Sequence, residues 1–138
     1  MARVGNLACV RLLVEHEIGE LNRIRWALGI RERTPLVESF SLVLAKLPYM
    51  KEEYAHVVAS TMRSSDVIFV EGDIMLAFLP GTDKGGAQQL MEGVRSFMGE
   101  EGRYVVVSYP DDGGTYEELI SSLRDRAKEN GIPCSFLS

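Results

Sequence analysis

The sequence predicts an α/β sandwich in which a central, mostly antiparallel sheet of about five strands is flanked by helices. The 138 residues, 46% of them hydrophobic, suit one compact domain with a core of its own. Short runs rich in Val, Leu and Phe alternate with longer segments whose apolar residues recur every three or four positions. The chain shows no internal repeat, linker or low-complexity tract, so residues 1–138 are expected to form a single domain.

The N-terminal third is expected to supply one strand and two helices. Residues 7–15 form a short apolar run of the kind found in strands that are buried on both faces. Residues 17–29 carry apolar side chains at helical spacing and end on a glycine. A second helix is predicted over residues 35–47, because a Thr-Pro pair is typical of a helix start. Its apolar residues surround nearly the whole helix, which indicates that it covers the core or meets another chain.

The middle of the chain predicts a helix and a β-hairpin. Apolar residues recur at helical spacing over residues 49–63. The apolar runs Val67–Val70 and Ile74–Leu79 then flank a Glu-Gly-Asp sequence at residues 71–73, which is typical of a hairpin turn.

The C-terminal half adds a helix and a strand. The helix is expected to follow the loop at residues 81–86, where Thr82 or Asp83 caps it, and to end near residues 99–102. Residues 103–109 predict the next strand.

A last helix is expected to open on a capping box made by Thr115 and Glu118 and to stop at Gly131. Residues 133–138 then predict a further edge strand.

Composition excludes several classes of function. The net charge of −5 gives no basic face for phosphate backbones, so nucleic-acid binding is disfavoured. The apolar runs are too short to span a membrane, and acidic residues interrupt the N-terminus before it could act as a signal sequence, so a cytoplasmic protein is expected. Cys9 and Cys134 are far apart and have no Cys or His partner at metal-ligand spacing, which indicates buried free thiols.

Common catalytic motifs are missing. The glycines of the 81–88 segment have the spacing of a phosphate-binding loop, but Ala87 and Gln88 stand where Lys and Ser or Thr are needed. His16 and His56 each lack a partner for nucleophilic catalysis or metal binding, so no cofactor and no metal are expected. Trp26 is interpreted as a packing residue or an interface anchor.

Two acidic sets have two interpretations. Glu15 and Glu17 follow the predicted first strand, and Glu71 and Asp73 flank Gly72 at the predicted hairpin tip. Carboxylates gathered from two such strand ends are suitable ligands for a hard divalent cation. The simpler interpretation, which we favour, is that the first pair complements a helix dipole and the second supplies turn geometry.

The segment from residue 55 to 98 resembles the diguanylate cyclase (GGDEF) family. It has a helix that ends in Arg-x-x-Asp, then a hairpin, then Leu-Pro-Gly-Thr-Asp, then an amphipathic helix. The sequence YPDDGGTYEELI and the later Ala-Lys-x-x-Gly at residues 127–131 also resemble that family. The resemblance covers roughly residues 55 to 131 and implies a nucleotidyl cyclase-like sandwich with a signalling function.

The departures from the family pattern fall at its nucleotide site. The resemblance implies that a signature Glu and an acid at the end of the first strand hold a metal; the Glu position is Ile74, and the strand position is Glu15 or Glu17. Glu71 replaces the first signature glycine and would repel phosphates, while Gly72 and Asp73 are kept. Of the family's residues that hold phosphate and guanine, at most Asn22 and Arg23 remain. These positions are therefore interpreted as a vestigial nucleotide site.

Arg63 and Asp66 match the family's Arg-x-x-Asp inhibitory site, which implies binding of the product cyclic di-GMP. This role requires both side chains to be exposed on one surface. The alternative is that Asp66 caps the helix or begins the hairpin, and that Arg63 is an ordinary surface residue.

Three functions remain open. The first is a catalytically inactive domain that binds cyclic di-GMP or a protein partner. The second is an oligomerisation module built on residues 35–47 and Trp26, for which self-association through the first two predicted helices is expected. The third is a cyclase with a rearranged acidic set of Glu15, Glu17 and Asp73, which is disfavoured because two-metal phosphoryl transfer needs its carboxylates in place.

Overall fold

A computed structural model describes residues 2–28, 39–47, 52–98 and 102–134. Its elements follow in this order: β1 (Arg3–Val4), a short 3-10 helix η1 (Leu7–Cys9), α1 (Val10–Leu28), β2 (Phe40–Lys46), α3 (Glu52–Ser60), β3 (Val67–Glu71), β4 (Ile74–Pro80), α4 (Lys84–Met98), β5 (Arg103–Tyr109) and α5 (Tyr116–Glu129).

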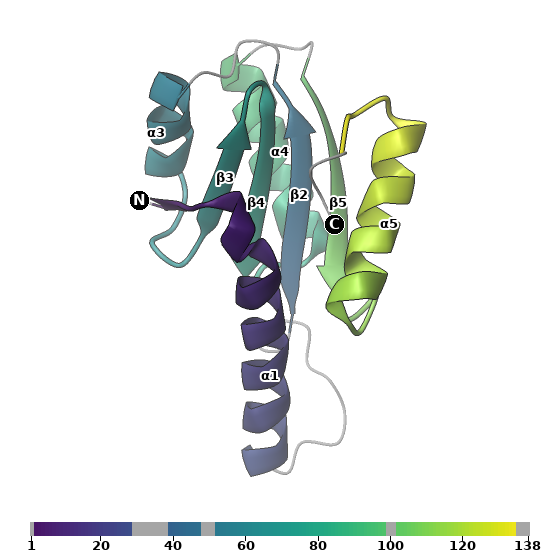
Figure 1. The fold of residues 1–138 in the computed structure, drawn as a ribbon. Coiled ribbons are helices and arrows are strands. Elements are labelled where there is room, and N and C mark those ends of the chain that lie inside the picture. The colour runs from purple at the N-terminus through teal and green to yellow at the C-terminus, as the bar shows by residue number, and fades with distance from the viewer. Residues whose placement is uncertain (1, 29–38, 48–51, 99–101, 135–138) are drawn as a thin grey trace.

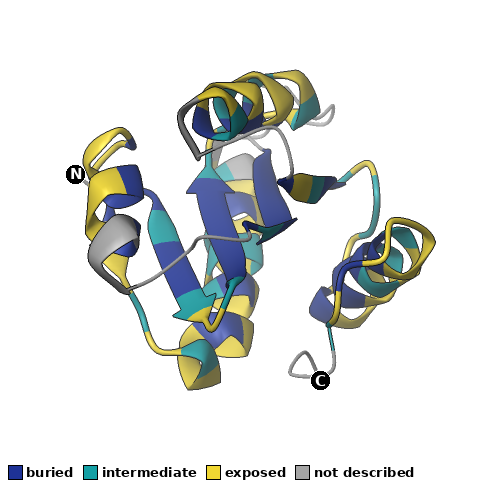
Figure 2. Ribbon diagram, turned by 90° about the horizontal axis from the view of Figure 1, so that it is seen from above, coloured by how far each residue is buried: buried dark blue, intermediate teal, exposed yellow. Residues whose placement is uncertain are grey.

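The described elements form three layers around one sheet (Figure 1). The sheet has five strands in the order β1-β3-β4-β2-β5, and only the pairing of β1 with β3 is parallel. Helices α1 and α5 pack on one face, and α3 and α4 pack on the other. Figure 2 shows the buried strands between helices whose outer sides are exposed. The predicted fold class, a mostly antiparallel five-stranded sheet flanked by helices, is confirmed.

Strand β2 lies in the sheet between β4 and β5, and the prediction of a helix over residues 35–47 is wrong for its described part. Leu42 and Leu44 pack with α1 and α5, whereas Val43 and Ala45 pack with α3 and α4. Because both faces of this strand are covered, it is apolar at nearly every position, and that pattern cannot be distinguished from a buried helix by periodicity. Residues 35–38 lie outside the described part of the chain.

The prediction of self-association through residues 35–47 loses its basis with this finding. The apolar residues from Phe40 to Ala45 are all buried inside the domain rather than offered to another chain.

Residues 7–15 are helical, so the predicted first strand is also wrong. Val10, Val14 and Leu21 face the core, whereas Arg11 and Leu12 are exposed, and this spacing is helical. The 3-10 turn η1 leads directly into α1, which joins the predicted strand and the following predicted helix into one helix of 19 residues. The high apolar content of residues 7–15 favoured the interpretation as a strand, although their buried positions follow a helical period.

The remaining predicted elements are largely confirmed. The hairpin is formed by β3 and β4, and α3, α4, β5 and α5 occupy their predicted segments. Thr115 caps α5 by accepting from the backbone N–H of Glu118, and Asp83 accepts from the N–H of Gly86 at the start of α4. Residues 133 and 134 are not in a strand, so the predicted edge strand is absent from its described part, and residues 135–138 lie outside it.

The two cysteines are not disulfide-bonded, but Cys9 is exposed and Cys134 is half-buried, so the prediction that both are buried is wrong. Among the described helices, none combines the length and the apolar character needed to cross a bilayer.

Candidate functional site

The register of the sheet defines two ends that separate the predicted site residues. Two rows of paired residues mark them: Phe40 with Pro80 and Tyr109 at what we call the turn end, and Lys46 with Ile74 and Arg103 at the hairpin end. The rows are six positions apart along β2, which corresponds to about 20 Å.

The hairpin end carries the Glu71-Gly72-Asp73 tip. Gly72 has a φ of 61°, a left-handed conformation that favours glycine, so the turn itself explains why this glycine is kept. The N–H of Leu47 donates to the carbonyl of Asp73 over 2.9 Å, which ties the end of β2 to the tip. The hairpin tip and the end of β2 therefore form one unit.

Charges of both signs surround this tip. Glu71 is exposed and Asp73 is half-buried, while Lys46 and Arg103 are paired neighbours in the adjoining strands. Ile74 is 6% exposed and belongs to the core that lies under α1 and α5. Within the described residues, no group of three or more His, Cys, Asp or Glu side chains is placed to hold a metal ion.

Glu15, Glu17 and Asn22 do not join the hairpin tip, which corrects the predicted nucleotide site. They lie on α1, where the side chains of Asn22 and Tyr109 are 3.5 Å apart at the turn end. Arg11 bridges Glu15 to Glu117 at the start of α5, which packs near the same end. Burial raises the pKa of Glu17 above its ordinary value.

The correction has a physical reason, which is that a segment other than the predicted first strand lies beside the hairpin tip. The strand that ends beside the hairpin tip is β2, and it ends in Lys46 followed by Leu47. The residues beside the tip are therefore a cation and an apolar side chain, and not Glu15 or Glu17.

The Arg63 to Asp66 segment forms a closed turn between α3 and β3. The carboxylate of Asp66 accepts from the backbone N–H of Arg63 and from its Nη2, each over 3.0 Å. Nη2 also donates to the carbonyl of Pro80 and, over 2.8 Å, to Oγ1 of Thr82. Asp66 is 2% exposed, so the expectation that both side chains are exposed is wrong for Asp66.

In this geometry Asp66 has a structural role, and the guanidinium of Arg63 remains partly exposed. Asp66 satisfies the turn, as in the alternative interpretation of the motif, and fixes the position of Arg63. All the hydrogen bonds of the guanidinium with described residues involve Nη2, and 54% of the Arg63 side chain is exposed. Arg63 thus lies at the turn end, a full sheet length from the hairpin tip.

The Asp66→Ala variant is expected to lose about 2 kcal/mol of unfolding free energy, because the backbone N–H of Arg63 loses its acceptor and the guanidinium loses its anchor. Arg63→Ala is expected to lose less, since its side chain is half exposed. Chemical denaturation with Ser65→Ala, an exposed neighbour, as the control measures both. Equal stabilities of wild type and Asp66→Ala would contradict the structural role.

Sequence reasoning missed a second ionic cluster at the turn end. Asp112 accepts from the N–H of Ser108 over 2.8 Å, from Nη2 of Arg126 over 2.6 Å and from Nζ of Lys84, which lies 2.9 Å away. These contacts join the turn after β5 to α4 and α5. The available signal was the Pro-x-Asp-Gly turn, because Asp in such turns commonly binds nearby backbone groups.

No family model matches the chain, and no curated protein matches it significantly. Among solved structures, it is similar to a sensory box/GGDEF family protein from Caulobacter crescentus CB15, with a TM-score of 0.55 and 21% sequence identity. The match covers 90% of this chain and 92% of that chain.

The chain has a GGDEF-like fold. At this identity the likeness concerns the fold alone, so chemistry must be argued from the residues. The GGDEF-like fold brings the hairpin tip next to the end of β2, and the residues found there are Lys46, Leu47 and Ile74.

Proposed function

We propose that this GGDEF-like domain is catalytically inactive and acts in signalling by binding a protein partner. The observation that carries the proposal is the pairing of Lys46 with Ile74 beside the hairpin tip. Two-metal phosphoryl transfer needs carboxylates that hold divalent cations against the phosphates. Lys46 repels such cations, and Ile74 has no ligand atom.

The remaining acids at the tip support the same proposal. Glu71 is exposed at the first position of the tip and repels an incoming triphosphate. Asp73 offers a single carboxylate, and its partners in the rearranged set, Glu15 and Glu17, lie toward the other end of the sheet. One carboxylate beside a lysine is a poor site for Mg²⁺, which prefers carboxylates together with substrate phosphates.

A second candidate is a cyclic di-GMP receptor that uses Arg63. Asp66 and Thr82 hold Nη2 of Arg63, while more than half of the side chain remains exposed. A preoriented guanidinium of this kind suits paired hydrogen bonds to a phosphate or a guanine edge. In this candidate Asp66 acts only by positioning Arg63, because its own carboxylate is buried.

The experiment combines a turnover assay with titration. The full chain is incubated with GTP and Mg²⁺ or Mn²⁺ beside an active diguanylate cyclase, and GTP is expected to remain unchanged. Formation of cyclic di-GMP would overturn the proposal of an inactive domain.

Calorimetric titration with cyclic di-GMP separates the two binding functions. A receptor that uses Arg63 loses about tenfold or more in affinity in Arg63→Ala, since a charge-assisted contact contributes about 1.5–3 kcal/mol. Arg103→Ala at the hairpin end removes the same charge and serves as the matched control. Absence of binding by the wild type at tens of micromolar supports the protein partner instead.

A further inference from the structure

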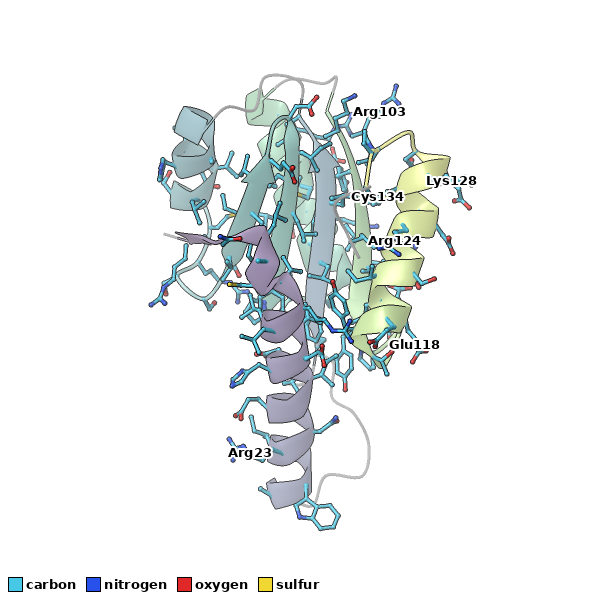
Figure 3. All side chains as sticks on the ribbon, viewed as in Figure 1. Arg23, Arg103, Glu118, Arg124, Lys128 and Cys134 are labelled. Carbon is cyan, nitrogen blue, oxygen red and sulfur yellow. The ribbon has the colours of Figure 1, made fainter. Side chains whose placement is uncertain are left out.

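Helix α1 projects beyond the sheet, so only part of its length packs against the domain (Figure 1). Val10, Val14 and Leu21 are its buried residues in the core. Figure 3 places Arg23 on the projecting part of the helix. The face opposite the core residues is exposed, and we call it the α1 outer face; it comprises Leu12, Glu15, His16, Gly19, Arg23 and Trp26.

The α1 outer face exposes unusually large apolar side chains. Leu12 is 72% exposed and Trp26 is 88% exposed, the two highest values among the large hydrophobic residues that the structure describes. Tryptophan is enriched at the energetic centres of protein interfaces, where its broad side chain is desolvated by a partner. On the isolated chain both residues leave apolar area in water, and burial of this area against a partner would be favourable.

Gly19 provides a second, independent observation. It is the midpoint of α1, nine residues from each end, and its φ is not in the left-handed region. A Cβ at this position would meet nothing within 4 Å. Glycine inside a helix costs about 0.5–1 kcal/mol relative to alanine. No contact within the described chain accounts for this glycine, whereas a second helix that crosses closely at this point would.

The α1 outer face is complementary to itself when two copies run antiparallel and cross at Gly19. Leu12, seven residues before Gly19, then faces the partner's Trp26, seven residues after it. Glu15, four residues before, faces the partner's Arg23, four residues after. Twofold symmetry repeats each pair, as in an isologous dimer. A parallel pair would instead place like charges opposite each other.

The charge pairs extend ion pairs that each copy already has. Glu15 is bound to Arg11, and Arg23 is bound to Glu20 over 2.9 Å. A contact between Glu15 and the partner's Arg23 joins these pairs into an alternating network, which contributes more than an isolated surface pair.

The other open glycine inside a described helix, Gly93 of α4, lacks this pattern. Its Cβ would also meet nothing within 4 Å. Four residues on either side of the crossing, where α1 has Glu15 and Arg23, an antiparallel pair that crosses at Gly93 would set Gln89 against Phe97, with no opposite charges. Self-complementarity therefore distinguishes α1.

A groove beside Leu12 provides room for the partner's Trp26. It has a volume of about 450 Å³ and lies between α1 and the edge of the sheet. Its lining includes Val4, Cys9, Leu12, His16, Val67 and Phe69. A mostly apolar groove whose polar lining residues are Arg3, Asn6 and His16 suits an indole ring, which is apolar with a single N–H donor.

We propose that a second copy of this chain binds the α1 outer face in an antiparallel arrangement, with the helices crossing at Gly19 and Trp26 of each copy in the groove of the other. The two domains then lie at opposite ends of the helix pair. This inference deepens the proposed function by naming the partner, but it does not depend on catalytic inactivity, which the GTP assay tests separately.

Sedimentation equilibrium of the full chain from 1 to 200 µM is the first test. Wild type is expected to approach twice the monomer mass of 15.4 kDa. Gly19→Leu and Trp26→Ala are expected to weaken the dimer at least about tenfold, the equivalent of 1.4 kcal/mol. Both positions are open in the monomer, so circular dichroism should show unchanged folding. A wild-type monomer at 200 µM, or a Gly19→Leu variant that dimerises normally, overturns the inference.

Charge reversal tests the antiparallel arrangement. Glu15→Arg alone and Arg23→Glu alone each place like charges across both contacts, so each variant is expected to be mainly monomeric. An equimolar mixture restores two Glu–Arg contacts in a heterodimer and is expected to recover association. A mixture that stays as weak as its two components overturns the arrangement, as does unimpaired association of either variant by itself.

Discussion

Phe40→Ala is expected to lower the unfolding free energy by about 4 kcal/mol, which would leave a marginal domain partly unfolded. Phe40 is fully buried at the turn end of β2. Its ring stacks on Tyr109, with centroids 5.0 Å apart and planes 7° from parallel, and it lies 5.4 Å from the ring of Phe78. Alanine removes these contacts and leaves a cavity that the two neighbouring strands, β4 and β5, cannot fill. Urea denaturation measures the loss.

Val57→Ala is the control for this variant, because Val57 is 40% exposed on α3, and a change below about 0.5 kcal/mol is expected. A similarly small effect of Phe40→Ala would contradict the placement of β2 in the centre of the sheet. The comparison also distinguishes the observed strand from a surface helix over the same residues.

Asp112→Ala is expected to destabilise the domain by about 3 kcal/mol, equivalent to a fall in Tm of about 10 °C. The side chain of Asp112 is only 11% exposed, and its loss leaves the N–H of Ser108 and Nη2 of Arg126 without this acceptor. The value is at the low end for a buried ion pair, because Arg126 is 35% and Lys84 37% exposed. Differential scanning calorimetry measures the change, with the exposed neighbour Asp111→Ala as the control.

The stabilisation by Asp112 is expected to depend on pH. Burial raises the pKa of Asp112, but hydrogen bonds from Lys84, Ser108 and Arg126 outweigh it, so the pKa lies below its ordinary value. A carboxyl group with a lowered folded-state pKa stabilises the fold fully above its unfolded pKa, about 3.9, and less as pH falls through the folded value. The difference in Tm between wild type and Asp112→Ala should therefore be constant near neutral pH and shrink below about pH 4. A difference that grows on acidification would contradict the ionic role.

The hairpin and the C-terminal helices could be predicted because their signals are local. The runs around the Glu-Gly-Asp tip predicted the hairpin of β3 and β4, and the Thr115 cap predicted the start of α5. Turn and cap geometry depends on residues only a few positions apart, so the amino-acid order alone specifies it.

The elements before α3 could not be assigned from the same kind of signal. A strand covered on both faces and a buried helix are both continuously apolar, so the sequence predicts a helix over residues 35–47 where residues 40–46 form a strand. For α1 the error is the reverse, since part of a helix is predicted as a strand. The adjacent apolar residues 12–14 obscure the helical spacing of Val10 and Val14. Because the strand and the helix are each predicted in the other's place, Glu15 and Glu17 are expected at the wrong end of the sheet.

By itself, the sequence determined the fold class, the hairpin and the apolar residue Ile74 at its tip, since each depends on the residue present or on its near neighbours. Only the tertiary structure decided that Lys46 lies beside the hairpin tip, that Asp66 is buried under Arg63, and that the α1 outer face has no cover from the described chain. These three facts depend on which distant segments pack together, and burial summed over the whole domain, rather than local preference, fixes that packing.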